Sequence, residues 1–139
     1  MENSDFARAI KELIECRSAV RVAAAFFLYT NKMSVALEDQ IISGDSLTSI
    51  LKGDELKVFN SRKNSNDINF VPLLHGMTFM AEYHKEANED SCFINGIIER
   101  ISNYDSRIKE LFEQYKKAYR ACNDLNPLFV REYEYLFGV

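Results

Sequence analysis

The chain has 139 residues, a length typical of one domain. It carries 17 Lys and Arg residues against 21 Asp and Glu residues, for a formal net charge of −4. This composition excludes a disordered chain, a collagen-like fibre, a disulfide scaffold and a basic nucleic-acid-binding tail. Because tight turns need glycine and proline, the presence of only five glycines and two prolines indicates a few long elements. We therefore expect one all-α domain over residues 1–139, a bundle of five to six helices.

The sequence also predicts a cytoplasmic protein with no membrane segment. Its acidic, polar start lacks the basic region of a signal peptide, and its three cysteines imply no disulfide framework. The longest nearly apolar run covers residues 19–29 and is interrupted by Arg21. This run is too short for a bilayer-spanning helix, which needs about 20 residues.

The first predicted helix begins at Ser4 or Asp5, either of which can cap its free N–H groups, and ends at residues 30–32. A second helix follows, capped by Ser34 and ended by Gly44, unless the two run together into one rod. The apolar residues of the first helix recur at intervals of three and four. They are Phe6, Ile10, Leu13, Cys16, Val20, Ala23 and Phe27.

Shorter elements are predicted in the middle of the chain. Residues 45–53 indicate a short helix that ends at a glycine, and residues 54–59 fit either a helix or a short strand. Nine of the ten residues in 60–69 are polar, which predicts a surface loop. Pro72 suits the first turn of a further helix, whose apolar face extends to His84.

The strongest pattern lies between residues 91 and 125, where apolar residues alternate in spacing between three and four. This repeat predicts one long helix with a packing seam, although residues 102–106 contain Ser, Asn and Asp that can end one helix and start another in phase. Pro127 then marks a stop before a short final helix. The patterned residues are Ile94, Ile97, Ile101, Tyr104, Ile108, Leu111, Tyr115, Ala118, Cys122 and Leu125.

A seam of this length needs a partner, which is either the first helix of the same chain or a second copy. Homodimerisation is therefore a hypothesis, slightly favoured because Arg17 and Arg21 lie near the stripe of the first helix. The candidate dimer seam comprises Ile94, Ile97, Ile101, Tyr104, Ile108, Leu111 and Tyr115.

Common catalytic and metal-binding motifs are missing from the sequence. His75 and His84 are nine residues apart, so one helix would place them on opposite sides, and neither HExxH nor CxxC occurs. His84 with Glu82, Glu86 or Cys92 is a weak candidate metal site. Cys16 and Cys122 fall on apolar stripes and are expected to be small core residues. We expect no cofactor, and the sequence favours a non-enzymatic role.

Arg21 is the charged residue that interrupts the most apolar run. A charge on a buried face must be paired or must reach outward. The sequence favours an internal ion pair with an acidic residue of another helix over an anion-binding role.

The leading functional hypothesis is a module that docks on another protein, such as an inhibitor, a neutraliser or an adaptor of the immunity-protein, antitoxin or phage-inhibitor type. An apolar patch with an acidic rim is typical of such a surface. The candidate residues are Phe79, Met80, Glu82, Tyr83, Glu86, Glu89 and Asp90.

Two other functions remain open. One is a metal-dependent or hydrolytic enzyme around His75, His84, Glu82 and Glu86. The other is nucleic-acid binding, which the net negative charge disfavours. Its candidate residues are Lys116, Lys117 and Arg120 with Tyr115 and Tyr119.

Overall fold

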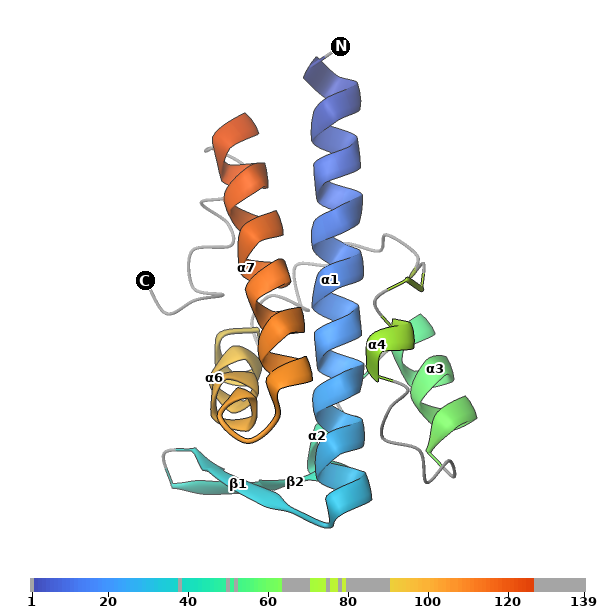
Figure 1. Cartoon of the computed structure of the whole chain (residues 1–139), viewed down its shortest axis with the longest axis vertical. Coiled ribbons are helices and arrows are strands. Elements are labelled where there is room, and N and C mark those ends of the chain that lie inside the picture. The colour runs from blue at the N-terminus through green and yellow to red at the C-terminus, as the bar shows by residue number, and fades with distance from the viewer. Residues whose placement is uncertain are drawn as a thin grey trace.

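The computed structural model describes residues 2–37, 39–49, 51, 53–63, 71–74, 76–77, 79 and 91–126. Within these residues the chain forms six helices and one antiparallel two-stranded sheet, which confirms the all-α class (Figure 1). None of the described helices is both long and apolar enough to cross a membrane. The elements are α1 (Glu2–Asn31), β1 (Ser34–Leu37), β2 (Gln40–Ser43), α2 (Gly44–Thr48), α3 (Asp54–Arg62), α4 (Val71–Leu74), α6 (Ser91–Ser102) and α7 (Ser106–Leu125).

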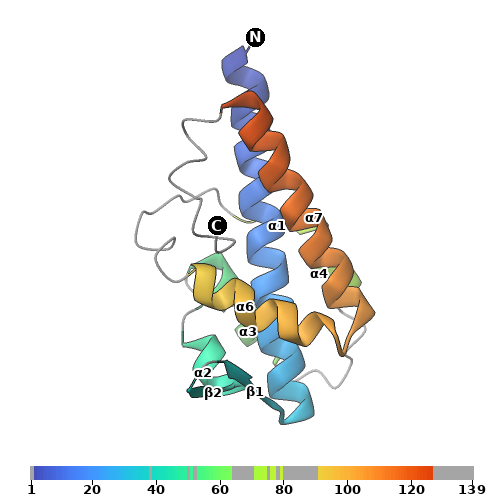
Figure 2. The same cartoon turned by 90° about the vertical axis from the view of Figure 1, so that its left-hand side faces the viewer.

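Helix α1 is the central element, and the other five described helices all contact it (Figures 1 and 2). Its 30 residues extend about 45 Å at 1.5 Å per residue. Every residue from 17 to 26 is buried, because α7, α6, α2 and α3 cover different sides of the helix. The small side chains of residues 23–25 suit the close approach of so many neighbours. The stretch of α1 from residue 17 to residue 26 therefore has no solvent-facing side.

The chain leaves α1 through a Schellman turn. Lys32 adopts a left-handed backbone conformation with φ of 51°. The N–H of Met33 donates to the carbonyl of Leu28 at 3.0 Å, and the N–H of Lys32 donates to the carbonyl of Tyr29 at 3.3 Å. These bonds satisfy carbonyl groups that the helix end leaves free. The predicted break at residues 30–32 is confirmed, and the continuous rod is wrong.

The predicted helix over residues 34–44 is also wrong, because this segment forms the hairpin of β1 and β2. Opposite residues of an antiparallel pair point to the same face, and successive residues alternate between faces. Val35 and Ile42 form one such pair and are buried, which anchors the inner face of the hairpin on the core. The full register is Ser34 with Ser43, Val35 with Ile42, Ala36 with Ile41, and Leu37 with Gln40.

Gly44 is the first residue of α2 and does not end a helix as predicted. The hydroxyl of Ser43 caps α2 by accepting from the N–H of Ser46 at 3.2 Å. A Cβ added at Gly44 would lie 2.6 Å from the backbone of Tyr29 in α1. Glycine is therefore needed here for close contact between two backbones.

The following segments match the predictions only in part. Residues 54–59 form a helix, so the strand alternative is wrong, and α3 continues to Arg62 into the predicted loop of residues 60–69. Residues 64–70 lie outside the described part of the chain. Helix α4 includes Pro72 but ends at Leu74, and residues 76, 77 and 79 are not helical. The predicted helix from Pro72 to His84 is therefore interrupted.

The long seam is divided between two helices in phase, as one of the sequence alternatives predicts. Helix α6 ends at Ser102, and Asp105 caps α7 by accepting from the N–H groups of Arg107 at 2.8 Å and Ile108 at 3.4 Å. The guanidinium of Arg107 also contacts this carboxylate at 2.6 Å. The prediction of a single long helix is wrong, because α6 ends before Asp105 and this residue is the N-cap at which α7 begins. Figure 2 shows α6 crossing α1.

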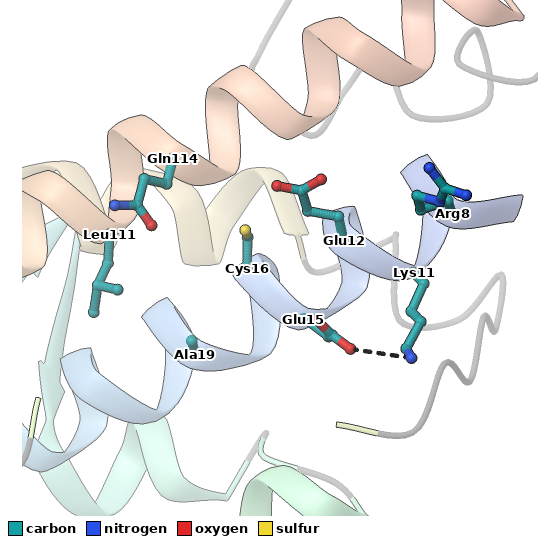
Figure 3. Close-up of a pocket in the computed structure, with 8 residues that line it drawn as sticks. All are labelled: Arg8, Lys11, Glu12, Glu15, Cys16, Ala19, Leu111 and Gln114. Carbon is teal, nitrogen blue, oxygen red and sulfur yellow. Dashed lines mark ion pairs between the residues drawn. The ribbon is translucent and has the colours of Figure 1, made fainter. Parts of the chain in front are cut away.

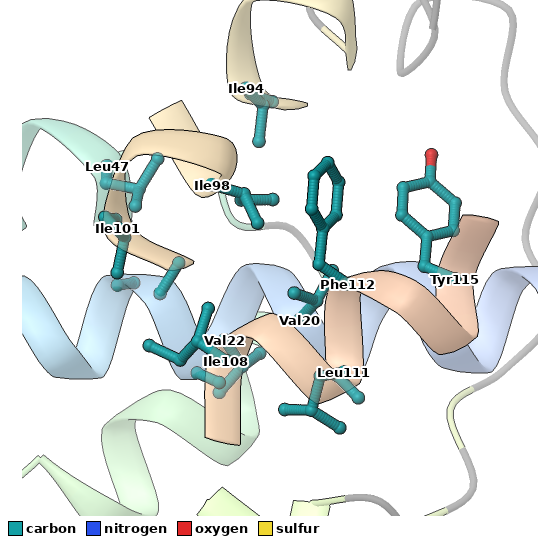
Figure 4. Close-up of a cluster of buried hydrophobic side chains, with 14 of the residues drawn as sticks. Val20, Val22, Leu47, Ile94, Ile98, Ile101, Ile108, Leu111, Phe112 and Tyr115 are labelled. Carbon is teal, nitrogen blue, oxygen red and sulfur yellow. The ribbon is translucent and has the colours of Figure 1, made fainter. Parts of the chain in front are cut away.

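The seam residues pack within one chain. Six of the seven are buried, whereas Tyr104 in the turn between α6 and α7 is 68% exposed. The core that they form with α1 and α2 is drawn in Figure 4. These buried side chains pack against other helices of the same chain, which is the intramolecular alternative. A second copy could contact them only if the bundle opened. Self-association through another surface stays a prediction.

Candidate functional site

The predicted protein-binding patch is described at one residue only. Phe79 is 2% exposed and belongs to the hydrophobic core, so its assignment to a binding surface is wrong. The other candidates in the patch, Met80, Glu82, Tyr83, Glu86, Glu89 and Asp90, lie outside the described residues, as do His75 and His84. The patch and the enzyme alternative therefore stay predictions. Among the residues that the structure does describe, no group of three or more His, Cys, Asp or Glu side chains is arranged to hold a metal.

The predicted nucleic-acid face on α7 is only partly accessible. Tyr115 is fully buried, so its ring is not available to stack on a base. The ammonium of Lys116 lies 4.3 Å from the centre of the Phe112 ring and 3.6 Å from a carboxylate oxygen of Glu113. Lys117 and Arg120 are exposed. Tyr119 is half-buried and packs against the core, and nucleic-acid binding stays a prediction.

A hollow of about 550 Å³ lies where α1 passes into the hairpin. Lys32 and Lys63 line it together with Asp45, so the charged groups of the lining carry a net charge of +1. Hydroxyl groups come from Thr30, Ser34 and Ser43. The remaining lining residues are Leu28, Tyr29, Met33 and Gly44. Four segments build this hollow: the end of α1, the open end of the hairpin, the start of α2 and the residue after α3.

The outer face of the hairpin continues from this hollow. Ser34 and Ser43 form the first register pair and line the hollow, and Ala36 and Ile41 form the next pair on the same face. The side chain of Ile41 is 76% exposed, the largest value among the exposed large apolar side chains that the structure describes. An apolar pair therefore lies beside a polar, positively charged hollow.

A second groove, of about 400 Å³, runs between α1 and α7 (Figure 3). Its lining is balanced in charge: Arg8 and Lys11 face Glu12 and Glu15, and Lys11 lies 3.9 Å from Glu15. Burial, with further contributions from Glu12 and Glu15, raises the pKa of the Cys16 thiol to about 11. At neutral pH this thiol stays protonated and is a poor nucleophile. The groove thus carries no evident chemistry.

Six polar residues form a buried polar cluster between α1, α3, α6 and α7. The hydroxyl of Ser18 donates to a carboxylate oxygen of Glu55 at 2.7 Å. Arg17 and Arg21 lie one turn apart on α1, and each is only 5% exposed. The members are Arg17, Ser18, Arg21, Glu55, Asn95 and Tyr115.

The phenol of Tyr115 interacts electrostatically with four other members of this cluster. Burial raises the pKa of its phenol, while the charges of Arg21 and Arg17 and a hydrogen bond with Asn95 lower it. The charge of Glu55 raises it again. Because burial is the largest of these effects, the phenol stays neutral. Arg21 thus lies in a buried setting that contains an acidic residue of another helix, Glu55, and shares it with Arg17. The internal ion pair of Arg21 stays a prediction.

Sequence reasoning missed both the hairpin surface and the full buried cluster. Lys32, Ser43 and Lys63 belong to three separate segments, so no local pattern joins them. Arg17 lies one turn before Arg21 on the apolar helix, and that spacing was the available signal for the cluster. Comparison of the chain with known protein families, with curated proteins and with solved structures gives no match.

Proposed function

We propose that this protein is a protein-binding module, an inhibitor, neutraliser or adaptor that docks on another protein through its hairpin surface. We define the hairpin surface as Lys32, Ser34, Ala36, Ile41, Ser43 and Lys63. The observation that carries the proposal is the exposure of Ile41 beside a hollow with two lysines. An apolar group next to a few polar ones is the usual composition of a docking site.

The shape and charge of this surface favour an extended, acidic segment of a partner. Within the described residues β1 and β2 pair only with each other, so each strand has an outer edge that can accept a further strand. An apolar partner side chain would cover Ala36 and Ile41. A carboxylate would reach into the hollow, where Lys32 and Lys63 outweigh Asp45 in charge.

The partner is identified by photo-crosslinking from the hairpin. A photoreactive phenylalanine analogue replaces Ile41 in one variant and Tyr104 in a control, because Tyr104 is similarly exposed but lies in the turn between α6 and α7. We expect one protein to be crosslinked from position 41 and not from position 104.

Binding of the purified partner is then measured by calorimetry. Ile41→Asp should weaken binding by roughly 30-fold or more, since an apolar anchor at the centre of an interface contributes about 2 kcal/mol. Lys32→Glu combined with Lys63→Glu should weaken binding and slow association, whereas Tyr104→Asp should leave both unchanged. Equal loss in Tyr104→Asp, or a crosslinked species with twice the mass of this chain, would contradict the proposal.

A further inference from the structure

Lys32 has an unfavourable backbone conformation at the end of α1. Its φ of 51° lies in the left-handed region, and in the described part of the chain no other residue except glycine has a positive φ. A Schellman turn usually has glycine at this position, because a Cβ is crowded by the neighbouring carbonyl there. Strained residues gather at functional sites, where the side chain gives a reason to keep them. Lys32 places a cation at the hollow beside the hairpin.

The two lysines of this hollow are not used to hold the described fold together. Lys32 and Lys63 come from different segments, and neither side chain forms an ion pair or a hydrogen bond with another described residue. The lining contains one acidic residue, Asp45, so its charged groups sum to +1. Thr30 adds a hydroxyl whose Oγ1 has no hydrogen-bond partner within the described residues. A ligand with one negative charge would therefore be attracted to this lining.

The remaining part of the lining is apolar. Leu28, Tyr29 and Met33 line the hollow from the end of α1 and the turn that follows it. The ring of Tyr29 contacts the ring of Phe59 edge-on, with 5.6 Å between the ring centres, which holds it in place. The volume of about 550 Å³ falls in the range of sites for small organic ligands, about 300–1,000 Å³. The hollow can thus take an apolar group as well as an anionic one.

We propose that this hollow is a binding site for a small monocarboxylic acid with a short apolar body. Its carboxylate would lie near Lys32 and Lys63, and its apolar body would pack against Tyr29 and Met33. A phosphate monoester carries about two negative charges near neutral pH and would leave the lining net negative, so the charge favours a carboxylate. The site does not rest on the proposed docking function. A bound acid would, however, compete with the carboxylate of a docked partner.

NMR titrations that follow the amide signals of the full chain test this site with four probes. Benzoate has one negative charge and an aromatic body. Benzamide has the same body without the charge, acetate has the charge without the body, and phenyl phosphate has the body with a second charge. We expect benzoate to shift the signals of residues 29–34 and 43–45 saturably, with a Kd of roughly 1 mM. The other three probes should bind at least roughly 10-fold more weakly.

Lys32→Gly separates the proposed role of the side chain from the stability of the fold. Glycine suits the left-handed conformation, so this variant should keep or raise Tm. It also removes the ammonium group, and we expect it to weaken benzoate binding by roughly 10-fold. Lys63→Met should weaken binding in the same way. Lys57→Met removes an exposed lysine of α3 that does not line the hollow, and it should leave Kd unchanged.

The proposal is overturned if benzoate causes no saturable shift, or if benzamide or acetate binds as tightly as benzoate. Wild-type affinity in Lys32→Gly would also overturn it, because the ammonium group would then play no part. Tighter binding of phenyl phosphate would show that the site prefers two charges and would exclude the carboxylate class. These titrations use the purified chain alone, so their failure is distinct from a failure to crosslink a protein partner at position 41.

Discussion

Helices α1 and α7 lie side by side and run in opposite directions, yet their sequences relate to burial in different ways (Figures 1 and 2). In α7 the buried residues form one stripe along the helix, and charged side chains such as Lys109 and Glu110 lie outside it. In α1 ten consecutive residues, 17–26, are all buried. A helical stripe therefore reveals the packed face of a helix that has one such face, but it does not describe a helix with neighbours on every side.

This difference determines what a charged residue means in each helix. On α7 charges mark the solvent side. Residues 17–26 of α1 have no solvent side, so Arg17 and Arg21 are buried despite their charge. A charged side chain on α7 is solvated by water. A charged side chain within residues 17–26 of α1 must instead find hydrogen-bond partners within the fold.

The largest expected effect comes from placing the same acid in both helices. Ala24→Asp puts a carboxylate at a fully buried position of α1, and we expect a loss of more than 4 kcal/mol in the free energy of unfolding, or no folding at all. Lys109→Asp on the exposed side of α7 should change it by less than about 0.5 kcal/mol. Urea denaturation measures the free energy of unfolding of both variants. Similar losses in the two variants would remove the distinction between the helices.

A smaller effect tests how closely α1 is surrounded. Gly44→Ala adds a methyl group 2.6 Å from the backbone of Tyr29, where no side chain can rotate away, and should cost about 1–3 kcal/mol. Gly76→Ala is the matched control, because a Cβ at that glycine meets nothing within 4 Å. The two midpoints of denaturation are compared with the wild type. A neutral Gly44→Ala would mean that α1 and α2 are separable at this point.

The smallest effect concerns the start of α7. Asp105→Ala removes the helix cap and the contact with Arg107, and should cost about 1–2 kcal/mol at pH 7. Hydrogen bonds from Arg107 hold the pKa of this carboxyl below its usual value. The stabilisation is therefore full above the usual pKa of an aspartate, near 4, and is lost as the pH falls through the lower folded-state pKa.

Urea denaturation across a pH series checks this sign. The difference between the wild type and Asp105→Ala should shrink as the solution is acidified below about pH 4. The exposed Asp124 provides a control, since Asp124→Ala should stay within about 0.5 kcal/mol of the wild type at pH 7. A difference that grows towards low pH would contradict the assigned role of Asp105.

The sequence was most informative where one local signal decides the structure. The stripe of α6 and α7 depends on spacing alone, and the Ser, Asn and Asp residues of 102–106 indicate the possible break between them. The sequence does not predict the hairpin, because over so few residues its apolar positions fit a helical face as readily as a strand pair. These positions are Val35, Leu37, Ile41 and Ile42. Only contact with the core decides between the two structures there.

The candidate sites were harder to predict because they depend on distant segments. The sequence marks Arg21 as a charge in an apolar helix, but the cluster that it shares with Glu55, Asn95 and Tyr115 draws on three other helices. The hollow beside the hairpin combines Lys32 with Lys63 in the same way. No spacing rule within one segment reports such proximity, so these groupings needed the three-dimensional structure.

The central position of α1 has a consequence for biosynthesis. A ribosome makes this helix before the elements that cover it, and α7, its largest partner, is the last of the described helices to be made. Until then the apolar surface of residues 19–26 lacks its native cover. The core around α1 therefore cannot form until α7 has been made. We expect the nascent chain to avoid aggregation either because α7 packs rapidly onto α1 or because a chaperone binds α1 first.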